Sequence, residues 1–274
     1  MRAMGKPTGL GALCRELGYS RQSYYQAKAR EHQRELEESA VLTGVRAVRE
    51  LLPETGGRKL QKHLKQAGIV IGRDRLLCIL RQHNLLVEKK KSCCRTTESN
   101  HRFRVYRNLV REGKPHRPNQ VMVTDITYLQ TLEGFCYLSL LMDLYSRKVV
   151  GYHVSKSLAV EGSLKALRMA LRSIKQPKGM IHHSDRGIQY CSKAYSGLLR
   201  NRGVSISMTE EAHVYENANA ERLNGILKQE LGLGGTMASF KVAKELVREA
   251  IELYNNKRLH LALNYRTPAE VHAA

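Results

Sequence analysis

Three acidic side chains in this 274-residue chain stand where carboxylates often do chemistry. Asp125 lies inside a β-branched run, Asp185 directly follows a short apolar segment, and Glu221 stands near the start of a helical pattern. Each acid alone has an ordinary structural explanation, since a first-turn Glu favours the helix dipole and a strand Asp can be held by one partner. Their settings and their separations, 59 and then 35 intervening residues, are informative together.

Three carboxylates that converge would repel one another by ~1–4 kcal/mol per pair. Hard divalent cations remove that repulsion, and Mg²⁺ prefers carboxylate oxygen. Two such ions about 3.5–4 Å apart can activate an attacking oxygen and stabilise a leaving one. The trio therefore predicts a site for two Mg²⁺ (or Mn²⁺) ions and phosphoryl transfer on a nucleic-acid backbone.

The elements that must position these acids follow from the pattern after residue 118. Short β-rich runs separated by turns predict an antiparallel three-stranded meander, and helices then alternate with two further strands. The expected strands are 121–129, 136–144, 149–154, 180–183 and 204–208, and the expected helices are 159–174, 192–201, 219–231 and 241–255. This order predicts an α/β fold of ribonuclease-H-like architecture for residues 118–274.

The N-terminal part has a helical pattern punctuated by glycine. A short helix ends at Gly18, Ser20 can cap the next helix, and the pair is typical of a helix-turn-helix. We expect that next helix to reach about Glu38 and a further segment, 41–52, to follow it. A second pair, 58–64 and 73–83, is joined by a turn at 68–72. We expect two small all-α modules, 1–52 and 53–88. Their candidate DNA contacts are Arg21, Arg58, Lys59, Arg73 and Arg75; ordinary helical hairpins with solvated basic faces are the alternative.

The formal net charge of +21 is uneven along the chain. Residues 1–118 hold 26 Lys and Arg against 11 Asp and Glu, a net of +15, whereas residues 119–274 hold 20 against 14, a net of +6. A basic surface attracts polyanions, and we expect double-stranded DNA as the partner. Residues 89–117 carry many cations and few apolar residues, which predicts a basic linker, either ordered on DNA or plainly solvated.

Several other classes are disfavoured by the composition. The sequence contains no apolar run of 18 residues, so we expect no membrane span and no membrane partner. The six cysteines form no CxxC pair, which argues against a zinc site and favours free thiols in a reducing cytoplasm.

Specific motifs make the chain resemble the DDE transposases of bacterial insertion sequences, with a retroviral-integrase-type core. The matching stretches are 124–128, 143–147 with 150–151, 182–190, 217–221, 227–231, 254–258, 260, 263–265 and 267–269. The resemblance covers 118–274 well and the N-terminal part more loosely. The chain departs from the family pattern at Met122, where Trp is common, and at Glu216, where Asp is common.

The resemblance implies that Asp125, Asp185 and Glu221 form the catalytic, metal-binding triad. It also implies that Lys228, two helical turns after Glu221, meets DNA near the scissile phosphate, although a solvated helix lysine is the alternative. Arg186 and Gln189, in the loop after Asp185, are further candidates for positioning DNA.

The implied activity is metal-dependent DNA cleavage and strand transfer at the ends of an insertion element, in a bacterial cytoplasm at the nucleoid. The family also implies homo-oligomers on paired ends and a role as the second-frame product, either fused to a first-frame product or partnered by it. Two other functions stay open: a non-catalytic DNA-binding regulator or decayed transposase, and a nuclease acting on RNA–DNA hybrids.

Overall fold

The computed structural model describes residues 9–87, 105–111, 113–210 and 218–274. The chain divides into two compact units, one of Met1–Glu50 with Gly56–Leu86 and one of Leu51–Thr55 with Val87–Ala274. Most of the expected basic linker, 89–104 and 112, lies outside the described residues, as do Glu216 and Asn217 of the family motif.

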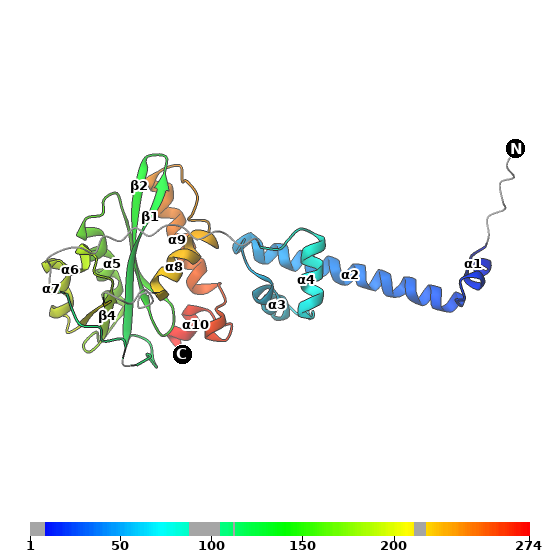
Figure 1. The fold of residues 1–274 in the computed structure, drawn as a ribbon, viewed down its shortest axis with the longest axis horizontal. Helices are drawn as coiled ribbons and strands as arrows, with labels where there is room; N and C mark the ends of the chain where they lie inside the picture. The colour runs from blue at the N-terminus through cyan, green and yellow to red at the C-terminus, as the bar shows by residue number, and fades with distance from the viewer. Residues whose placement is uncertain (1–8, 88–104, 112, 211–217) are drawn as a thin grey trace. The chain divides into compact units, whose positions relative to one another are not determined.

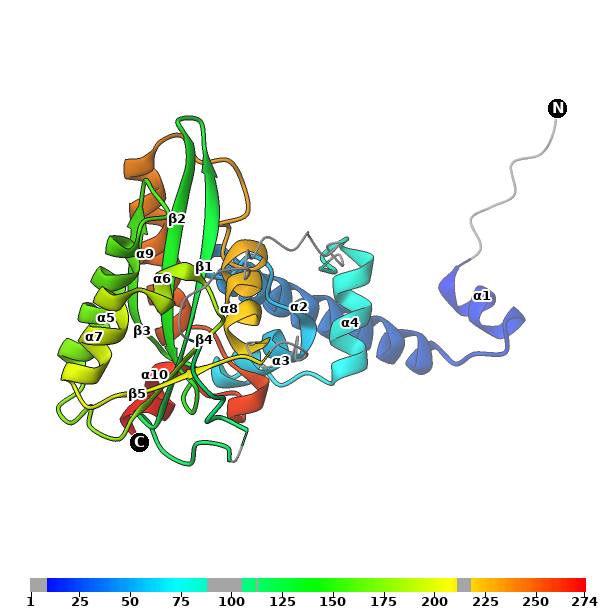
Figure 2. The same cartoon turned by 60° about the vertical axis from the view of Figure 1, so that its left-hand side comes forward.

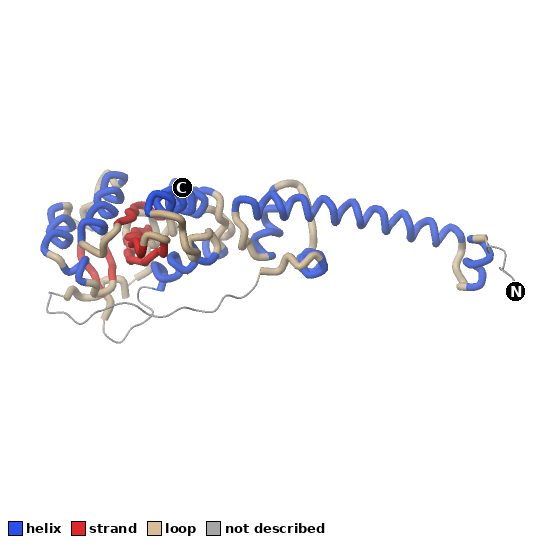
Figure 3. Tube along the Cα trace, turned by 90° about the horizontal axis from the view of Figure 1, so that it is seen from above, coloured by secondary structure: helices blue, strands red, loops and turns tan. Residues whose placement is uncertain are grey.

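The first unit is all-α. Its helices are α1 (Leu10–Glu16), α2 (Arg21–Leu51), α3 (Gly57–Gln66) and α4 (Arg73–Gln82). The expected cap is present, because the Ser20 hydroxyl accepts a hydrogen bond of 3.0 Å from the amide of Ser23. Helix α2 runs without interruption through residues 38–41, where the sequence suggested two segments (Figure 3). No glycine or proline stands there to end it.

One hydrophobic cluster holds this unit together. The C-terminal part of α2 contributes Val41 and Val45, one turn apart on a single face, and these pack with apolar side chains of α3 and α4. The other buried members are Leu60, Leu64, Leu76, Ile79 and Leu80. The two expected modules, 1–52 and 53–88, therefore draw on a shared core.

The second unit alternates strands and helices as the sequence predicts. Its strands are β1 (Val121–Thr131), β2 (Gly134–Asp143), β3 (Val149–Ser155), β4 (Ile181–Ser184) and β5 (Ser205–Met208). Its helices are α5 (Val160–Ser173), α6 (Ile188–Cys191), α7 (Lys193–Asn201), α8 (Ala218–Gln229), α9 (Phe240–Asn256), the 3₁₀ turn η1 (Leu261–Leu263) and α10 (Pro268–Ala273).

The five strands form one sheet in the order β3-β2-β1-β4-β5. β1 and β2 pair antiparallel as a long hairpin (Figure 2), and β2 pairs antiparallel with β3. β4 joins β1 in parallel, and β5 joins β4 in parallel. The predicted arrangement of three antiparallel and two parallel strands is confirmed, and it makes β1 the central strand.

Helices cover both faces of the sheet (Figure 1). On one face, α8 and α9 pack against β1 and β2 in a core that includes Leu223, Leu227, Val247 and Tyr254. On the other face, α5 and α7 pack against the sheet around Leu167, Tyr195 and Leu199. The central strand is thus buried from both sides. A polar residue on it must therefore either face an opening or form hydrogen bonds with neighbouring groups.

Across the ranges that the structure describes, no helix combines the length and apolar character needed to cross a membrane.

Candidate functional site

The parallel pairing of β1 and β4 aligns the two aspartates of the predicted site. Val121 pairs with Ile181, and Val123 pairs with His183. The same register, continued for two residues along both segments, places Asp125 opposite Asp185, which directly follows β4. Two carboxylates separated by 59 residues therefore meet because adjacent parallel strands share one register.

The Asp125 carboxylate is held by two hydrogen bonds. Oδ1 accepts from the amide of Ile126 at 2.9 Å, and Oδ2 accepts from the side-chain amide of Asn224 at 2.7 Å. Burial and the nearby Asp185 raise the pKa of Asp125 to about 7; Glu221 raises it further, while the two hydrogen bonds oppose the shift. Asp125 thus lies within electrostatic range of both other acids.

The other two acids differ from each other in their exposure. Asp185 is partly buried, and its Oδ1 accepts a 3.0 Å hydrogen bond from the amide of Gly187, an Asx turn that orients the carboxylate. Glu221 lies in the first turn of α8 and is exposed. Among the described residues, no three His, Cys, Asp or Glu side chains are close enough together to hold a metal ion. The trio is electrostatically coupled without forming a closed coordination shell.

A cavity of about 480 Å³ opens beside the two aspartates. Aromatic and apolar side chains form much of its wall. Its lining consists of Asp125, Ile126, Tyr128, Phe135, Tyr137, Leu158, Asp185, Gly187, Ile188, Gln189 and Tyr190. The cavity therefore offers carboxylate oxygens on one side and flat apolar surfaces on the other.

Lys228 reaches this cavity wall from α8. Its Nζ lies 4.1 Å from the centroid of the Tyr128 ring, a cation–π contact. Tyr128 in turn packs edge-on against Phe135, with the ring centroids 5.5 Å apart. Glu221, Asn224 and Lys228 follow one another at spacings of three and four residues, so they share one face of α8.

The loop after Asp185 carries the two further candidates for positioning DNA, Gln189 and Arg186, and their side chains have different surroundings. Gln189 lines the cavity, and its side-chain amide donates to the carbonyl of Leu158 at 2.9 Å. Arg186 is partly buried and donates from Nε to the carbonyl of Thr209 at 2.8 Å, so one edge of its guanidinium ties this loop to the end of β5.

The two histidines before Asp185 are core residues. Both are buried; His182 Nε2 lies 2.9 Å from the Tyr195 hydroxyl, and His183 Nδ1 lies 2.8 Å from the Ser207 hydroxyl. Burial lowers the pKa of His182 to about 3, which keeps its ring neutral. These contacts fit a structural role.

The five predicted DNA contacts of the first unit lie on its helices. Arg21 opens α2, with its guanidinium beside Gly11 of α1. On α4, Arg73 pairs with the neighbouring Asp74 at 2.8 Å, and Arg75 pairs with Glu38 of α2 at 3.1 Å. On α3, Arg58 is exposed and Lys59 is partly buried.

Sequence reasoning missed Asn224 as a member of the site. Its side chain is 8% exposed, and its carbonyl Oδ1 has no hydrogen-bond partner among the described residues. The available signal was its position three residues after Glu221, which puts both residues on one helix face. An asparagine on a helix usually faces solvent, so spacing alone did not distinguish it.

Comparisons with known proteins give matches over most of the chain. Two family models, both described as integrase core domain, match residues 115–213 and 202–268. A transposase for insertion sequence element IS629 of Shigella sonnei is 30% identical over 276 residues, which cover 97% of this chain and 92% of the relative. An insertion element IS600 uncharacterized 31 kDa protein, also of Shigella sonnei, is 36% identical over 94% of this chain and 96% of its own length.

A solved structure shares the fold. A chain of the simian T-cell lymphotropic virus intasome in complex with PP2A regulatory subunit B56 gamma matches with a TM-score of 0.50 and 18% identity. The match covers 80% of this chain and 71% of the viral chain. The predicted ribonuclease-H-like core, preceded by a helical region, is confirmed.

Proposed function

Because the chain belongs to the transposases of bacterial insertion sequences that carry an integrase core domain, we propose that it cleaves DNA at element ends and transfers the strand to target DNA. The observation that carries the proposal is the alignment of Asp125 and Asp185 across β1 and β4, with Asn224 of the Glu221-bearing helix bonded to Asp125. Burial, and then the nearby Asp185, raise the pKa of Asp125 to about 7. This shift fits a site whose negative charge is compensated by bound cations.

The donor set suits a hard divalent cation. Asp125 and Asp185 offer carboxylate oxygens on adjacent segments, and Glu221 stands within electrostatic range on α8. Each Asp125 oxygen accepts one hydrogen bond and retains capacity for a further contact, since a carboxylate oxygen has two lone-pair sites. We assign these three acids as ligands for Mg²⁺ (or Mn²⁺), with two ions expected. Cations held by these residues would lower the pKa of an attacking water or 3′-hydroxyl and stabilise the leaving oxygen.

The remaining residues act on position and charge. Asn224 and the Ile126 amide fix the orientation of the Asp125 carboxylate, and the turn at Gly187 fixes that of Asp185. The Tyr128 ring keeps the Lys228 ammonium beside the cavity, where it can contact a DNA phosphate. Gln189 lines the same cavity, and the Thr209 carbonyl holds Nε of Arg186, which keeps this side chain in the loop after Asp185.

The first unit supplies a second, positively charged contact with duplex DNA. Arg58, Lys59, Arg73, Arg75 and Arg21 are its proposed contacts, of which Arg73 and Arg75 would exchange an intramolecular carboxylate for a phosphate. Family membership also supports assembly of several copies on paired ends and a first-frame partner.

The test is strand transfer with the full-length chain, Mg²⁺ and DNA that carries the inverted repeats of its element. Asp185→Asn should abolish cleavage and joining, whereas Glu245→Gln, at an exposed acid on α9, should leave both intact. Activity that persists in Asp185→Asn would overturn the assignment. DNA binding without any cleavage by the unmodified chain would favour a regulator, and cleavage of an RNA–DNA hybrid lacking element ends would favour a hybrid nuclease.

A further inference from the structure

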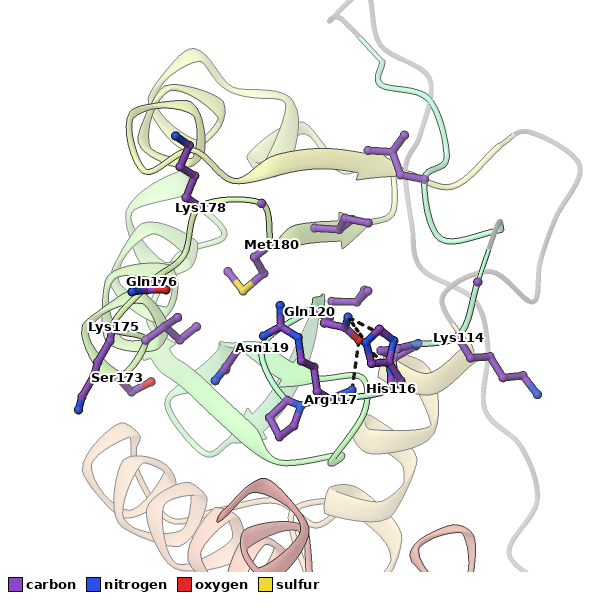
Figure 4. Close-up of a pocket in the computed structure, with 18 residues that line it drawn as sticks. Lys114, His116, Arg117, Asn119, Gln120, Ser173, Lys175, Gln176, Lys178 and Met180 are labelled. Carbon is purple, nitrogen blue, oxygen red and sulfur yellow. Dashed lines mark hydrogen bonds between the residues drawn. The ribbon is translucent and has the colours of Figure 1, made fainter. Parts of the chain in front are cut away.

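A second cavity, of about 770 Å³, lies in the second unit where β1 and β4 begin. Two segments form most of its lining, residues 113–121 before and at the start of β1 and residues 173–181 between α5 and β4. Figure 4 shows Ser173, Lys175 and Lys178 on one side of the cavity and Lys114, His116 and Arg117 on the other.

The rim of this cavity is positively charged. Lys114, Arg117, Lys175 and Lys178 line it and are exposed, and His116 adds a fifth group that can carry charge. The described residues of the lining include no Asp or Glu. Like charges drawn from two separate segments repel one another unless an anion lies between them. The arrangement therefore fits an anionic ligand that touches both rims.

Hydrogen bonds fix the backbone that carries these cations. The Gln120 side-chain oxygen accepts from the amides of His116 and Arg117, at 2.7 and 3.2 Å, and the Gln120 carbonyl accepts from the Ile181 amide at 2.8 Å. The amide of Asn119 donates to Asp143 Oδ2 at 2.7 Å. Hydrogen bonds thus hold the segment before β1 within itself and to β4 and β2. Its cations therefore project from a defined backbone.

The cavity and the aspartates lie at different levels of the same two strands. Val121 and Ile181 line the cavity and pair with each other, and Asp125 and Asp185 each stand four residues further along. At a rise of about 3.3 Å per residue, the two levels are separated by roughly 13 Å. The basic rim is therefore distinct from the cavity that contains the aspartates.

We propose that this basic rim, defined by Lys114, Arg117, Lys175 and Lys178, binds the phosphodiester backbone of duplex DNA. The inference rests on the proposed function in one respect, namely that duplex DNA is the substrate. A lysine is a flexible point charge and an exposed arginine a broad fork, and both suit phosphates whose position along a groove varies. Such contacts fix the register and orientation of DNA without reading its sequence.

Duplex DNA fits this rim better than a small anion does. The four Lys and Arg side chains of the rim are exposed along a large, open cavity rather than buried around one point. A single phosphate bound by such groups would keep most of its water. A polyanion can neutralise both rims at once and gain from counterion release at each contact.

The experiment compares two triple variants with matched charge. One is Arg117→Ala with Lys175→Ala and Lys178→Ala, on the rim. The control is Arg168→Ala with Lys193→Ala and Lys257→Ala, three exposed cations on or beside α5, α7 and α9. The full-length proteins bind a fluorescent synthetic duplex of arbitrary sequence across a range of NaCl concentrations, and thermal melting verifies that each variant folds.

Each lost phosphate contact lowers the slope of log affinity against log salt by about 0.9, so the rim variant should lower it by about 2 to 3. The control should change the slope by less than half as much. Equal slopes for the two triples would overturn the proposal, because they would show a general charge effect. A rim variant that melts early is replaced by its single substitutions, of which Lys175→Ala must still change the slope.

The outcome is separable from that of the proposed function. The rim variant is judged by the salt slope of DNA binding alone, and the catalytic assignment is judged by cleavage in Asp185→Asn, so each proposal has its own readout. If Asp185→Asn retained cleavage while the rim variant still lost its salt slope, the catalytic assignment would fail and the rim proposal would stand. If Asp185→Asn abolished cleavage while the rim variant and the control had equal salt slopes, the catalytic assignment would stand and the rim proposal would be overturned.

Discussion

The side-chain amide of Asn224 donates a 2.7 Å hydrogen bond to Oδ2 of Asp125, which ties helix α8 to the central strand at the carboxylate itself. The bond also opposes the upward shift of the Asp125 pKa. It therefore couples the helix that carries Glu221 to the protonation of a residue on the sheet.

Asn224→Ala should weaken divalent-cation binding. The Asp125 carboxylate would lose a donor that stabilises its charged form, so its pKa would rise and its orientation would loosen. Loss of a partner of this kind typically costs about 10–100-fold in metal affinity or activity. Titration of cleavage activity with Mg²⁺ measures the effect. Asn219→Ala, on the same helix, is the control, and equal losses in the two variants would contradict the role assigned to Asn224.

Asp125 should make stability without metal depend on pH. Its pKa is about 7 in the folded chain and near 3.8 when unfolded, so between these values the folded state binds the extra proton. The free energy of unfolding then falls as pH rises from about 4 to 7. Asp125→Asn removes this penalty, and at pH 8 in chelator it should stabilise the chain by about 1–3 kcal/mol.

Thermal melting from pH 5 to pH 8 measures this difference. Mg²⁺ should raise the melting temperature of the unmodified chain and not that of Asp125→Asn. Asp74→Asn serves as the control, because its neighbour Arg73 lowers the pKa of that exposed carboxyl. A pH dependence that is the same in Asp125→Asn and the unmodified chain would refute the raised pKa.

Lys228 should contribute to cleavage through its position over Tyr128. Lys228→Ala removes a charge beside the cavity and should slow cleavage about tenfold or more, a loss of ~1.4 kcal/mol or more in transition-state stabilisation. Tyr128→Leu, which removes the cation–π contact of ~1 kcal/mol, should slow it roughly fivefold, and Tyr128→Phe should preserve the rate. Single-turnover rates measure these effects. Lys241→Ala is the lysine control, and a rate loss in Tyr128→Phe equal to that in Tyr128→Leu would assign the effect to the hydroxyl instead.

Gly151 should be required for the packing of α5 on β3. A Cβ at this position would collide with the Ala166 carbonyl oxygen and lie 2.9 Å from the Ala170 Cβ. Gly151→Ala should therefore destabilise the second unit by about 1–3 kcal/mol. Gly197→Ala on α7, where a new Cβ meets nothing within 4 Å, should be neutral or stabilising. Chemical denaturation compares the two, and similar midpoints would contradict the steric argument.

The sequence was sufficient for most of the second unit because its β-rich runs are separated by turns and its longer helices have a clear period. Strands such as β2 alternate with turns, and α5 shows apolar residues at spacings of three and four, which only one arrangement buries. The four-residue helix α6 was not anticipated, since a single turn carries too little periodicity to detect. In the first unit, α2 is one continuous helix where two segments were predicted, because a run of charged residues does not by itself end a helix.

The site was only partly accessible to sequence reasoning. Asp125 and Asp185 could be brought together because the predicted ribonuclease-H-like architecture makes the first and fourth strands neighbours. The hydrogen bond from Asn224 and the ring beneath Lys228 depend on how α8 docks, which is settled by packing among residues far apart in the chain. The basic rim was hidden for the same reason, since its two segments are about 60 residues apart and the first fell within the expected linker.

Helix α8 carries Glu221, Asn224 and Lys228, while Leu223 and Leu227 of the same helix are buried against the sheet and α9. A small rotation of this helix would alter a proposed cation ligand, the partner of the Asp125 carboxylate and a proposed phosphate contact in one movement. Conservative substitutions in the apolar interface between α8 and α9 would therefore mimic active-site mutants in an activity screen. Only measurements that separate metal affinity, DNA affinity and cleavage rate would distinguish a displaced helix α8 from the loss of a functional side chain.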